Sequence, residues 1–482
     1  MSTEKKIAYA ALDIGTSQVK IGVYCPFLSR SIILINNFSN EAIFGSSGEV
    51  RADYKAVREK SFVLFKELGA FLKINKVEVL YLGICGHVSS LLEWNKAKAT
   101  PPEEPFPIWL DTTCYSRLEE YQSVMGNGRS KEIIGTFLPK GTNWLFTKLL
   151  HKRQEGFSRD SIFLQVSDVL FFELTGTYKT HFSSQISMVN LGKRKYAPEL
   201  LNHLELDESS LPSIEYAPSP IQETVKDLFH FPFKSFVFPA MADLYTSLYG
   251  LRLQDKEGFM LANTSEQAGA FYLTKPKALD NFLSISFDPG FINYGSTNTG
   301  GNIVHWFIST VLNKKLTPEL LSELTTKAAS IEPKDTPIIL PYLQGERAPL
   351  WNSKLTASIL ELNSFHTDVH LFRAILESIS FARRHCFEEL GIESMDIIKI
   401  GGGSSKNALW NLIKATVLKK PIAVADEKEL SIAGMIYYIM EAEKSKFEKP
   451  GINFSIIEPD SNLIYSYEEK YRKFIQYQKL LS

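Results

Sequence analysis

A short internal match constrains the fold of this chain more than any other feature, because it divides the chain into two nearly equal halves. Residues 12–24 (LDIGTSQVKIGVY) and 260–272 (MLANTSEQAGAFY) share a Thr-Ser pair and a closing tyrosine at one constant offset. In each copy the pair separates two apolar, strand-like runs, which is a hairpin pattern. A repeated opening hairpin predicts two similar α/β lobes around a central cleft. We therefore expect one lobe from residues 1–249 and a second from 250–482.

Length and composition agree with a two-lobed globular protein. The chain has 482 residues, of which 44% are hydrophobic and 22% charged, and these values disfavour disordered, collagen-like and coiled-coil proteins. Its 53 Lys and Arg residues nearly balance its 54 Asp and Glu residues, for a net charge of -1. A neutral chain gives no electrostatic footprint for nucleic acid or for an anionic membrane. We therefore expect the chain to bind small ligands locally, rather than nucleic acid or a membrane.

The cysteines and the N-terminus favour a reducing, cytoplasmic location. Cys25, Cys85, Cys114 and Cys386 are far apart and form no zinc-binding spacing, so neither a disulfide scaffold nor a structural metal is expected. The first residues pass from a charged hexamer into a strand-like run without a secretory signal. No apolar run approaches the roughly 20 residues that a membrane span requires.

Periodicity predicts several elements around these features. We expect a hairpin over 7–24, a buried strand over 78–85 and helical segments over 113–125 and 142–154. In the second half, a long helix is expected over about 367–390. A strand, a glycine-rich turn (GGGSSKN) and a helix are expected between 396 and 418.

The first hairpin turn carries a combination suited to phosphate. Gly15 lets the backbone approach a ligand closely, and the hydroxyls of Thr16 and Ser17 can donate to phosphate oxygens. Asp13 could hold a hydrated magnesium ion, and Lys20 stands on the returning strand. An ordinary strand-connecting turn is the alternative.

Two turns in the second half add to this pattern. Thr264 and Ser265 repeat the hydroxyl pair, here followed by Glu266, and could grip a polyphosphate together with the first turn. Gly401, Gly402 and Gly403 lie between a strand and a helix, where a phosphate-bearing ligand could approach a helix N-terminus. The chain has neither a GxGxxG nor a Walker sequence, and a tight structural turn remains the alternative for the glycines.

Asp243 is the candidate general base. It precedes a helix-like run, where an aspartate is commonly an N-cap. Near the junction of the two halves, however, its carboxylate could accept a proton from a hydroxyl that attacks a phosphoryl group.

The chain resembles the FGGY family of carbohydrate kinases, within the superfamily of actin-like and hexokinase-like ATPases. The likeness runs over the whole length through DIGTSQVK at 13, LFFELTGTYKTHFSSQ at 170, PAMADLYTSLYG at 239, NTSEQAG at 263, GGNIVHW at 300, LPYLQGERAPLW at 340, FRAILE at 372 and GGGSSKNALW at 401. It implies two ribonuclease-H-like lobes, each a five-stranded mixed sheet with flanking helices. It also implies a kinase that moves the γ-phosphoryl group of ATP to a hydroxyl of a small sugar, with Mg²⁺ as cofactor.

The resemblance also assigns roles to particular residues. Asp243 becomes the catalytic base and Asp13 the residue beside the metal. The nucleotide contacts implied are Gly15, Thr16, Ser17, Lys20, Thr264, Ser265, Gly301, His305, Gly402, Gly403 and Asn407. The sugar contacts implied are His87, Ser89, Trp109, Asp111 and Asp243. A small sugar and ATP are the expected partners, without nucleic acid or membrane, and a homodimer is left open.

The chain departs from the family pattern in the sugar and phosphate regions. Many members have Gln-Met-His where this chain has 87–89, and Asp-x-Arg where it has 111–113. Asn263 and Glu266 replace glycines on either side of the second Thr-Ser pair, and Glu361 replaces one ahead of FRAILE. The acceptor is therefore left open between a ketose, such as a pentulose or heptulose, and a sugar acid such as gluconate. A binding protein of kinase descent with weakened catalysis is the alternative function, and a filament-forming ATPase is a further one.

Overall fold

The computed structural model describes residues 5–97, 102–158, 160–216, 222–223, 234–263 and 265–481, which form two compact units. The first unit comprises Met1–Arg252 and Glu429–Ile452, and the second comprises Leu253–Lys428 and Asn453–Ser482. The segment 429–452, which the sequence places in the second half, thus packs with the first unit. The physical reason is that its helix is apolar on nearly all sides and covers the sheet of that unit.

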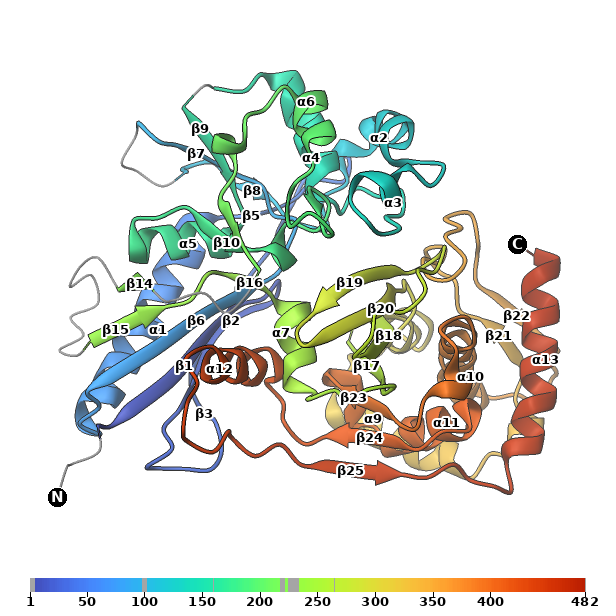
Figure 1. The fold of residues 1–482 in the computed structure, drawn as a ribbon. Helices are drawn as coiled ribbons and strands as arrows, with labels where there is room; N and C mark the ends of the chain where they lie inside the picture. The colour runs from blue at the N-terminus through green and yellow to red at the C-terminus, as the bar shows by residue number, and fades with distance from the viewer. Residues whose placement is uncertain are drawn as a thin grey trace. The chain divides into compact units, whose positions relative to one another are not determined.

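A mixed sheet forms the centre of the first unit (Figure 1). Its five core strands follow the order β3-β2-β1-β6-β15, in which β2 is antiparallel to β1 and to β3, whereas β6 and β15 run parallel to β1. Two short strands extend it to seven. The strands are β1 (Ile7–Ile14), β2 (Gln18–Tyr24), β3 (Ile33–Ser39), β6 (Val79–Gly86), β14 (Gln222–Glu223), β15 (Lys234–Val237) and β16 (Met241–Ala242).

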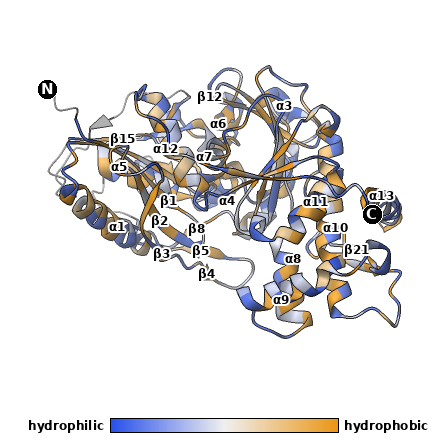
Figure 2. Cartoon of the chain, turned by 90° about the horizontal axis from the view of Figure 1, so that it is seen from below, coloured by the Kyte–Doolittle hydropathy of each residue, from blue (hydrophilic) through white to orange (hydrophobic). Residues whose placement is uncertain are grey.

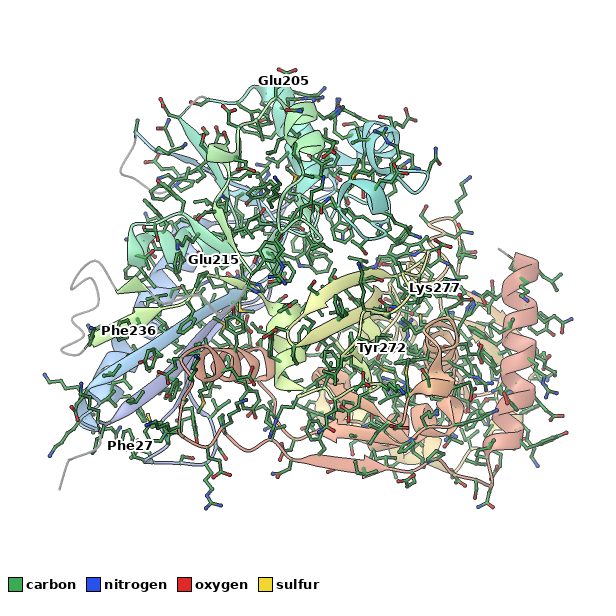
Figure 3. All side chains as sticks on the ribbon, in the orientation of Figure 1. Phe27, Glu205, Glu215, Phe236, Tyr272 and Lys277 are labelled. Atoms are coloured by element: carbon green, nitrogen blue, oxygen red, sulfur yellow. The ribbon has the colours of Figure 1, made fainter. Side chains whose placement is uncertain are left out.

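Aromatic side chains reinforce the register of this sheet. Tyr9 of β1 faces Tyr81 of β6, which faces Phe236 of β15. The rings stack with centroids 5.6 Å and 5.3 Å apart (Phe236 is labelled in Figure 3). Such cross-strand pairs help to hold one register, and a one-residue slip would turn every buried side chain of β1 toward the opposite face.

Helices and smaller sheets complete the first unit. Helix α1 (Tyr54–Ile74) has hydrophobic and hydrophilic positions interspersed (Figure 2), and it buries Leu64, Phe65 and Leu68 in the core. The other helices are α2 (Leu118–Met125), α3 (Arg129–Ile133), α4 (Leu145–Lys152), α5 (Val166–Thr175), α6 (Pro198–Leu204), α7 (Asp243–Gly250) and α12 (Leu430–Ala442). The remaining strands are β4 (Ile43–Phe44), β5 (Val50–Ala52), β7 (Leu92–Asn95), β8 (Phe106–Pro107), β9 (Ser161–Leu164), β10 (Lys179–His181), β11 (Val189–Asn190), β12 (Lys195–Tyr196) and β13 (Ser213–Glu215).

Helices α7 and α12 pack through glycines with almost no space between their backbones. A Cβ atom on Gly434 of α12 would lie 1.6 Å from the carbonyl oxygen of Thr246 in α7. One on Gly250 would lie 2.5 Å from the carbonyl oxygen of Leu430. Only glycine allows this approach, and the packing fixes the helix that begins at Asp243.

The second unit repeats the strand order of the first. Its core strands run β20-β18-β17-β23-β24, with the same parallel and antiparallel pairings, and an added strand at each edge again makes seven. The strands of this sheet are β17 (Gly258–Ala262), β18 (Glu266–Tyr272), β19 (Leu283–Phe287), β20 (Gly290–Ser296), β23 (Ile398–Gly401), β24 (Ile422–Ala425) and β25 (Phe454–Ile457). The expected five-stranded mixed sheet is therefore the core of both units.

The helices of the second unit agree with the periodicity of the sequence. The predicted long helix is α10 (Asp368–Glu389), and the predicted strand-turn-helix is β23 followed by α11 (Ala408–Leu418). The others are α8 (Gly301–Trp306), which continues into one π-helical turn, α9 (Pro318–Ala329) and α13 (Ile464–Leu481), beside the strands β21 (Ile338–Leu340) and β22 (Ser358–Leu360). No helix in the described parts of the chain has the length and apolarity that a bilayer crossing needs.

Candidate active site

The first hairpin turn gathers charge at the end of the central strand. Asp13 and Lys20 face each other across β1 and β2, and the Lys20 Nζ atom lies 3.4 Å from Asp13 Oδ2. Lys20 also forms an ion pair with Glu429, which directly precedes α12. Burial alone would lower the pKa of Lys20, but Asp13 and Glu429 together raise it above its ordinary value. The ammonium group therefore stays charged.

The two carboxylate oxygens of Asp13 differ in their surroundings. Oδ2 accepts a hydrogen bond from the Ser431 hydroxyl at 2.6 Å, whereas Oδ1 is buried and has no hydrogen-bond partner among the described residues. A buried oxygen without a partner fits the protein ligand of a hydrated Mg²⁺ ion, which needs only one or two carboxylates. Consistently, the described residues contain no cluster of three or more His, Cys, Asp or Glu side chains placed to hold a metal.

Asn40 holds the first hairpin turn through two hydrogen bonds. The Asn40 side chain donates to the Gly15 carbonyl at 3.0 Å, and its backbone N–H donates to the Ser17 carbonyl at 2.7 Å. Within the described residues, no hydrogen bond uses the backbone N–H of Thr16 or Ser17. The carbonyls of Gly15 and Ser17 are thus occupied, whereas the amides of Thr16 and Ser17 have no acceptor among the described residues.

Asp243 is the first residue of α7. The residue in the capping position is Ala242, so Asp243 is not the N-cap that local sequence favours. Its carboxylate accepts the Leu244 N–H at 2.6 Å. Burial, and next the negative charge of Asp13, raise the pKa of Asp243 to about 6. The group is ionised at neutral pH but binds a proton more readily than an ordinary aspartate, as a general base should.

Of the residues proposed for the sugar, His87 follows the strand end that pairs beside Asp243. Gly86 pairs with Ala242 in the parallel contact of β6 with β16, so His87 and Asp243 leave neighbouring strand ends together. His87 is buried, its Nδ1 atom has no partner among the described residues, and burial lowers its pKa to about 4. Ser89 is buried with a φ of 61°, a conformation that non-glycine residues adopt at a cost and that is common at functional sites.

Trp109 and Asp111 are placed very differently. The Trp109 Nε1–H donates to the Thr16 hydroxyl at 2.9 Å. This bond joins Trp109, which the resemblance assigns to the sugar, to the first hairpin turn. The buried carboxylate of Asp111 instead accepts the backbone N–H groups of Val50 at 2.9 Å and Thr113 at 3.0 Å, and the Thr113 hydroxyl. Both carboxylate oxygens of Asp111 therefore hold a loop. Asp111 also lines a polar cavity of about 700 Å³, together with Lys148 and His151.

In the second unit, Ser265 is half-buried and Thr264 lies outside the described residues. Glu266 points into the protein and is fully buried, where it contacts Lys414 Nζ at 2.7 Å. Its carboxylate therefore points away from the surface of the turn.

The glycines expected at the nucleotide lie around Asn263. The Gly301 N–H donates to the Asn263 carbonyl, and the Gly403 N–H donates to the Asn263 side chain, both at 3.1 Å. Gly402 has a φ of 104°, and a Cβ there would lie 2.6 Å from Asn263 Oδ1. The backbone therefore requires glycine at Gly402, whereas no atom lies within 4 Å of a Cβ built on Gly403.

Asn407 and His305 complete the predicted nucleotide contacts. The Asn407 side chain caps α11 by accepting the Trp410 N–H at 3.0 Å, and it donates to the Thr325 hydroxyl at 2.9 Å. Its polar atoms are thus engaged within the protein. His305 is exposed on α8.

Sequence reasoning missed several residues around the first turn. Asn40, Glu429 and Ser431 contact it from distant parts of the chain, and the Ser183 hydroxyl accepts the Ala242 N–H at 3.1 Å next to Asp243. No local pattern marks these residues. In the sequence, the small residues within the apolar run of α12 were the only sign that this helix packs closely against another one.

Family models match both parts of the chain. The N-terminal domain of the FGGY family of carbohydrate kinases matches residues 8–231, and the C-terminal domain of that family matches residues 259–442. Together the two matches cover most of the sequence.

Individual relatives are distant but extend over nearly the full length. Glycerol kinase 2 of Streptomyces avermitilis is 23% identical, with 89% of this chain and 87% of the relative covered. Among solved structures, the gluconate kinase of Lactobacillus acidophilus has a TM-score of 0.85 at 17% identity, covering 99% of this chain and 98% of that one. The xylulose kinase of Rhodospirillum rubrum has a TM-score of 0.87 at 16% identity, covering 98% and 99%. The structural likenesses establish a shared fold.

Proposed function

Because the chain belongs to the FGGY family of carbohydrate kinases, with ATP as phosphoryl donor, we propose that its acceptor is a small uncharged polyol or ketose and that Asp243 is the general base. One observation carries this proposal. An aspartate with a pKa raised to about 6 begins α7, beside the strand end that bears His87.

The side chains assigned to the acceptor favour an uncharged molecule. His87 is neutral at physiological pH because burial lowers its pKa to about 4, and Ser89 and Trp109 are uncharged. Lys20, the cation of the neighbouring turn, is already paired with Asp13 and Glu429. A sugar acid would need a cation for its carboxylate, whereas hydroxyls can be read by neutral donors and acceptors.

The chemistry proposed is a direct transfer. Asp243 accepts the proton of the acceptor hydroxyl as that oxygen bonds to the γ-phosphorus, and the bond from the γ-phosphorus to the bridging oxygen breaks to release ADP. The amides of Thr16 and Ser17 stabilise negative charge on the transferred group. Mg²⁺, held through Asp13 Oδ1 and water, would supply further charge neutralisation.

An ADP-release assay with glycerol, pentuloses, heptuloses and gluconate tests the proposal. We expect turnover with at least one uncharged acceptor and none with gluconate. Asp243→Asn should lower kcat by about 10²–10⁴-fold, the range typical of a lost general base, with little change in nucleotide affinity. Asp207→Asn, at an exposed aspartate of the same unit, is the control.

The possible results separate the alternatives. Wild-type turnover in Asp243→Asn would refute the assignment of the base. A preference for gluconate would refute the uncharged acceptor. Tight ATP binding without turnover of any acceptor would favour the binding-protein alternative.

A further inference from the structure

A polar cavity in the first unit has no role in the proposed transfer. It encloses about 700 Å³, a volume typical of sites for small molecules. Asp111 lines it, but the other residues assigned to the acceptor, His87, Ser89, Trp109 and Asp243, are not among the described residues of its lining. The cavity is therefore distinct from the proposed acceptor site.

A small sheet and a helix contribute two walls of this cavity. One wall consists of residues that pair across β7 and β9, namely Glu93 with Phe163 and Asn95 with Ser161. Because successive side chains of a strand point to opposite faces, the intervening residues pack into the core: Trp94, Ile162 and Leu164. The second wall is one face of α4, with residues at spacings of three and four: Lys148, His151 and Lys152.

Lys148 is the unusual group of this cavity. Its side chain is buried, and its Nζ atom donates to the backbone carbonyl of Asp111 at 3.0 Å. It forms no ion pair with any described residue. Lys152, by contrast, pairs with both Glu93 and Glu155 at 2.9 Å. A buried ammonium group whose bonded partner is a neutral carbonyl is held at a cost in free energy.

Burial has a chemical consequence for this amine. It lowers the pKa of Lys148, and the nearby Cys114 and Asp111 offset only part of that effect. A larger fraction of the amine is therefore unprotonated and nucleophilic at neutral pH than in an exposed lysine. His151 lines the same cavity, and its buried Nδ1 atom has no partner among the described residues. An amine and an imidazole that can move protons thus line one cavity.

We propose that Lys148 is a modification site at which small neutral carbonyl compounds form an imine. The amine nitrogen bonds to the carbonyl carbon, and the carbonyl oxygen leaves as water that carries away both protons of the amine. His151 can pass a proton to the departing hydroxyl. The inference goes beyond the proposed function and does not depend on it.

The charges along the cavity favour a neutral compound. The described residues of the lining include three cations and five carboxylates: Arg51, Lys148 and Lys152, with Glu93, Glu103, Glu104, Asp111 and Glu155. An unprotonated imine leaves one cation fewer, so an anionic compound would be held among an excess of negative charge. The hydroxyls of a neutral compound can bond to amines and carboxylates without that cost.

The test traps the imine by reduction and locates it. The full chain is incubated at pH 7 with D-glyceraldehyde and sodium cyanoborohydride, and peptide mass spectrometry measures the labelling rate of each lysine. We expect Lys148 to be labelled at least about tenfold faster than Lys66, which is exposed on α1 and, with an ordinary pKa of about 10.4, almost fully protonated. In urea-unfolded protein the two rates should become similar.

Two variants tie the labelling to the cavity. Lys148→Arg keeps the positive charge, but a guanidinium group stays protonated and does not form the imine. Label should disappear from that peptide and stay unchanged at Lys66. His151→Asn should slow the labelling of Lys148 by about tenfold or more and leave Lys66 unaffected. Lys66→Arg is the matched control, since it should remove only its own label.

The outcomes separate the parts of the inference. Labelling of Lys148 no faster than that of Lys66 in the folded wild-type protein would overturn it, and this comparison requires no variant to fold. Glyoxylate, an aldehyde that carries a carboxylate, should give a lower ratio of the two rates than glyceraldehyde. An equal or higher ratio would overturn the preference for neutral compounds. Failure of phosphoryl transfer to every acceptor would refute the proposed function and leave these ratios unchanged.

Discussion

The opening hairpins of the two units share their strand pairing but differ in where they place charge. In the first, Asp13 and Lys20 stand at the turn, and one oxygen of Asp13 has no partner among the described residues. In the second, Glu266 is turned inward and paired with Lys414 and Arg383. The two carboxylates also stand on different strands of their hairpins, since Asp13 lies near the end of β1 whereas Glu266 is the first residue of β18. The repeated hairpin therefore carries a carboxylate before its turn in one unit and after its turn in the other.

This comparison predicts that removing the two carboxylate charges has opposite consequences. Glu266→Gln leaves two buried cations short of a counter-charge, so we expect it to lower the free energy of unfolding by about 3–5 kcal/mol. Urea unfolding of the full chain measures this loss. If Glu266→Gln were as stable as wild type, the carboxylate would not be the anchor that its contacts indicate.

Asp13→Asn should lower kcat and leave the free energy of unfolding nearly unchanged. Lys20 keeps Glu429 as a partner, and the amide can still accept the Ser431 hydroxyl. Loss of the proposed Mg²⁺ ligand should lower kcat by about 10²–10³-fold, equivalent to about 3–4 kcal/mol. Steady-state rates over a range of Mg²⁺ concentrations, with urea unfolding in parallel, test both parts. Wild-type kcat at all Mg²⁺ concentrations would contradict the role given to Asp13.

Gly434→Ala tests whether the contact of α12 with α7 positions Asp243, the proposed general base. The added methyl group would collide with the Thr246 carbonyl, so α12 and α7 must separate, at a cost of about 1–3 kcal/mol in the free energy of unfolding. Because α7 begins at Asp243, kcat should also fall, by about tenfold. Gly451→Ala is the control, since no atom lies closer than 4.0 Å to a Cβ built there. Equal behaviour of the two variants would show that the helix contact does not position the base.

Much of this arrangement was readable from the sequence. The repeated hairpin predicted two similar α/β lobes, and the family resemblance implied their mixed sheets. Strand and helix periodicity located β1, β2, β6, α10 and α11. Asp13 and Lys20 could be paired in advance because a hairpin fixes which residues face each other.

The rest depended on contacts between distant parts of the chain. Ser431 reaches Asp13 from 418 residues away, and Glu429 reaches Lys20 from a segment that the sequence places in the other half. The resemblance assigns Asp111 to the sugar, but the sequence does not show that its carboxylate accepts hydrogen bonds from Val50 and Thr113. Likewise, local sequence does not say toward which side the carboxylate of Glu266 turns.

Ser431→Ala is the smallest test of the difference between the two turns. Asp13 Oδ2 loses one hydrogen bond of 2.6 Å from a hydroxyl to a carboxylate, which should cost about 1.5–3 kcal/mol in the free energy of unfolding and reduce kcat only a few-fold. Ser431→Thr, which keeps the hydroxyl, should restore both values, and Ser380→Ala should not affect kcat because that hydroxyl bonds within its own helix. A hydroxyl carries no charge, so it orients the carboxylate without supplying a counter-charge. If Ser431→Ala cost as much stability as Glu266→Gln, the two carboxylates would be held equally firmly and the contrast between them would fail.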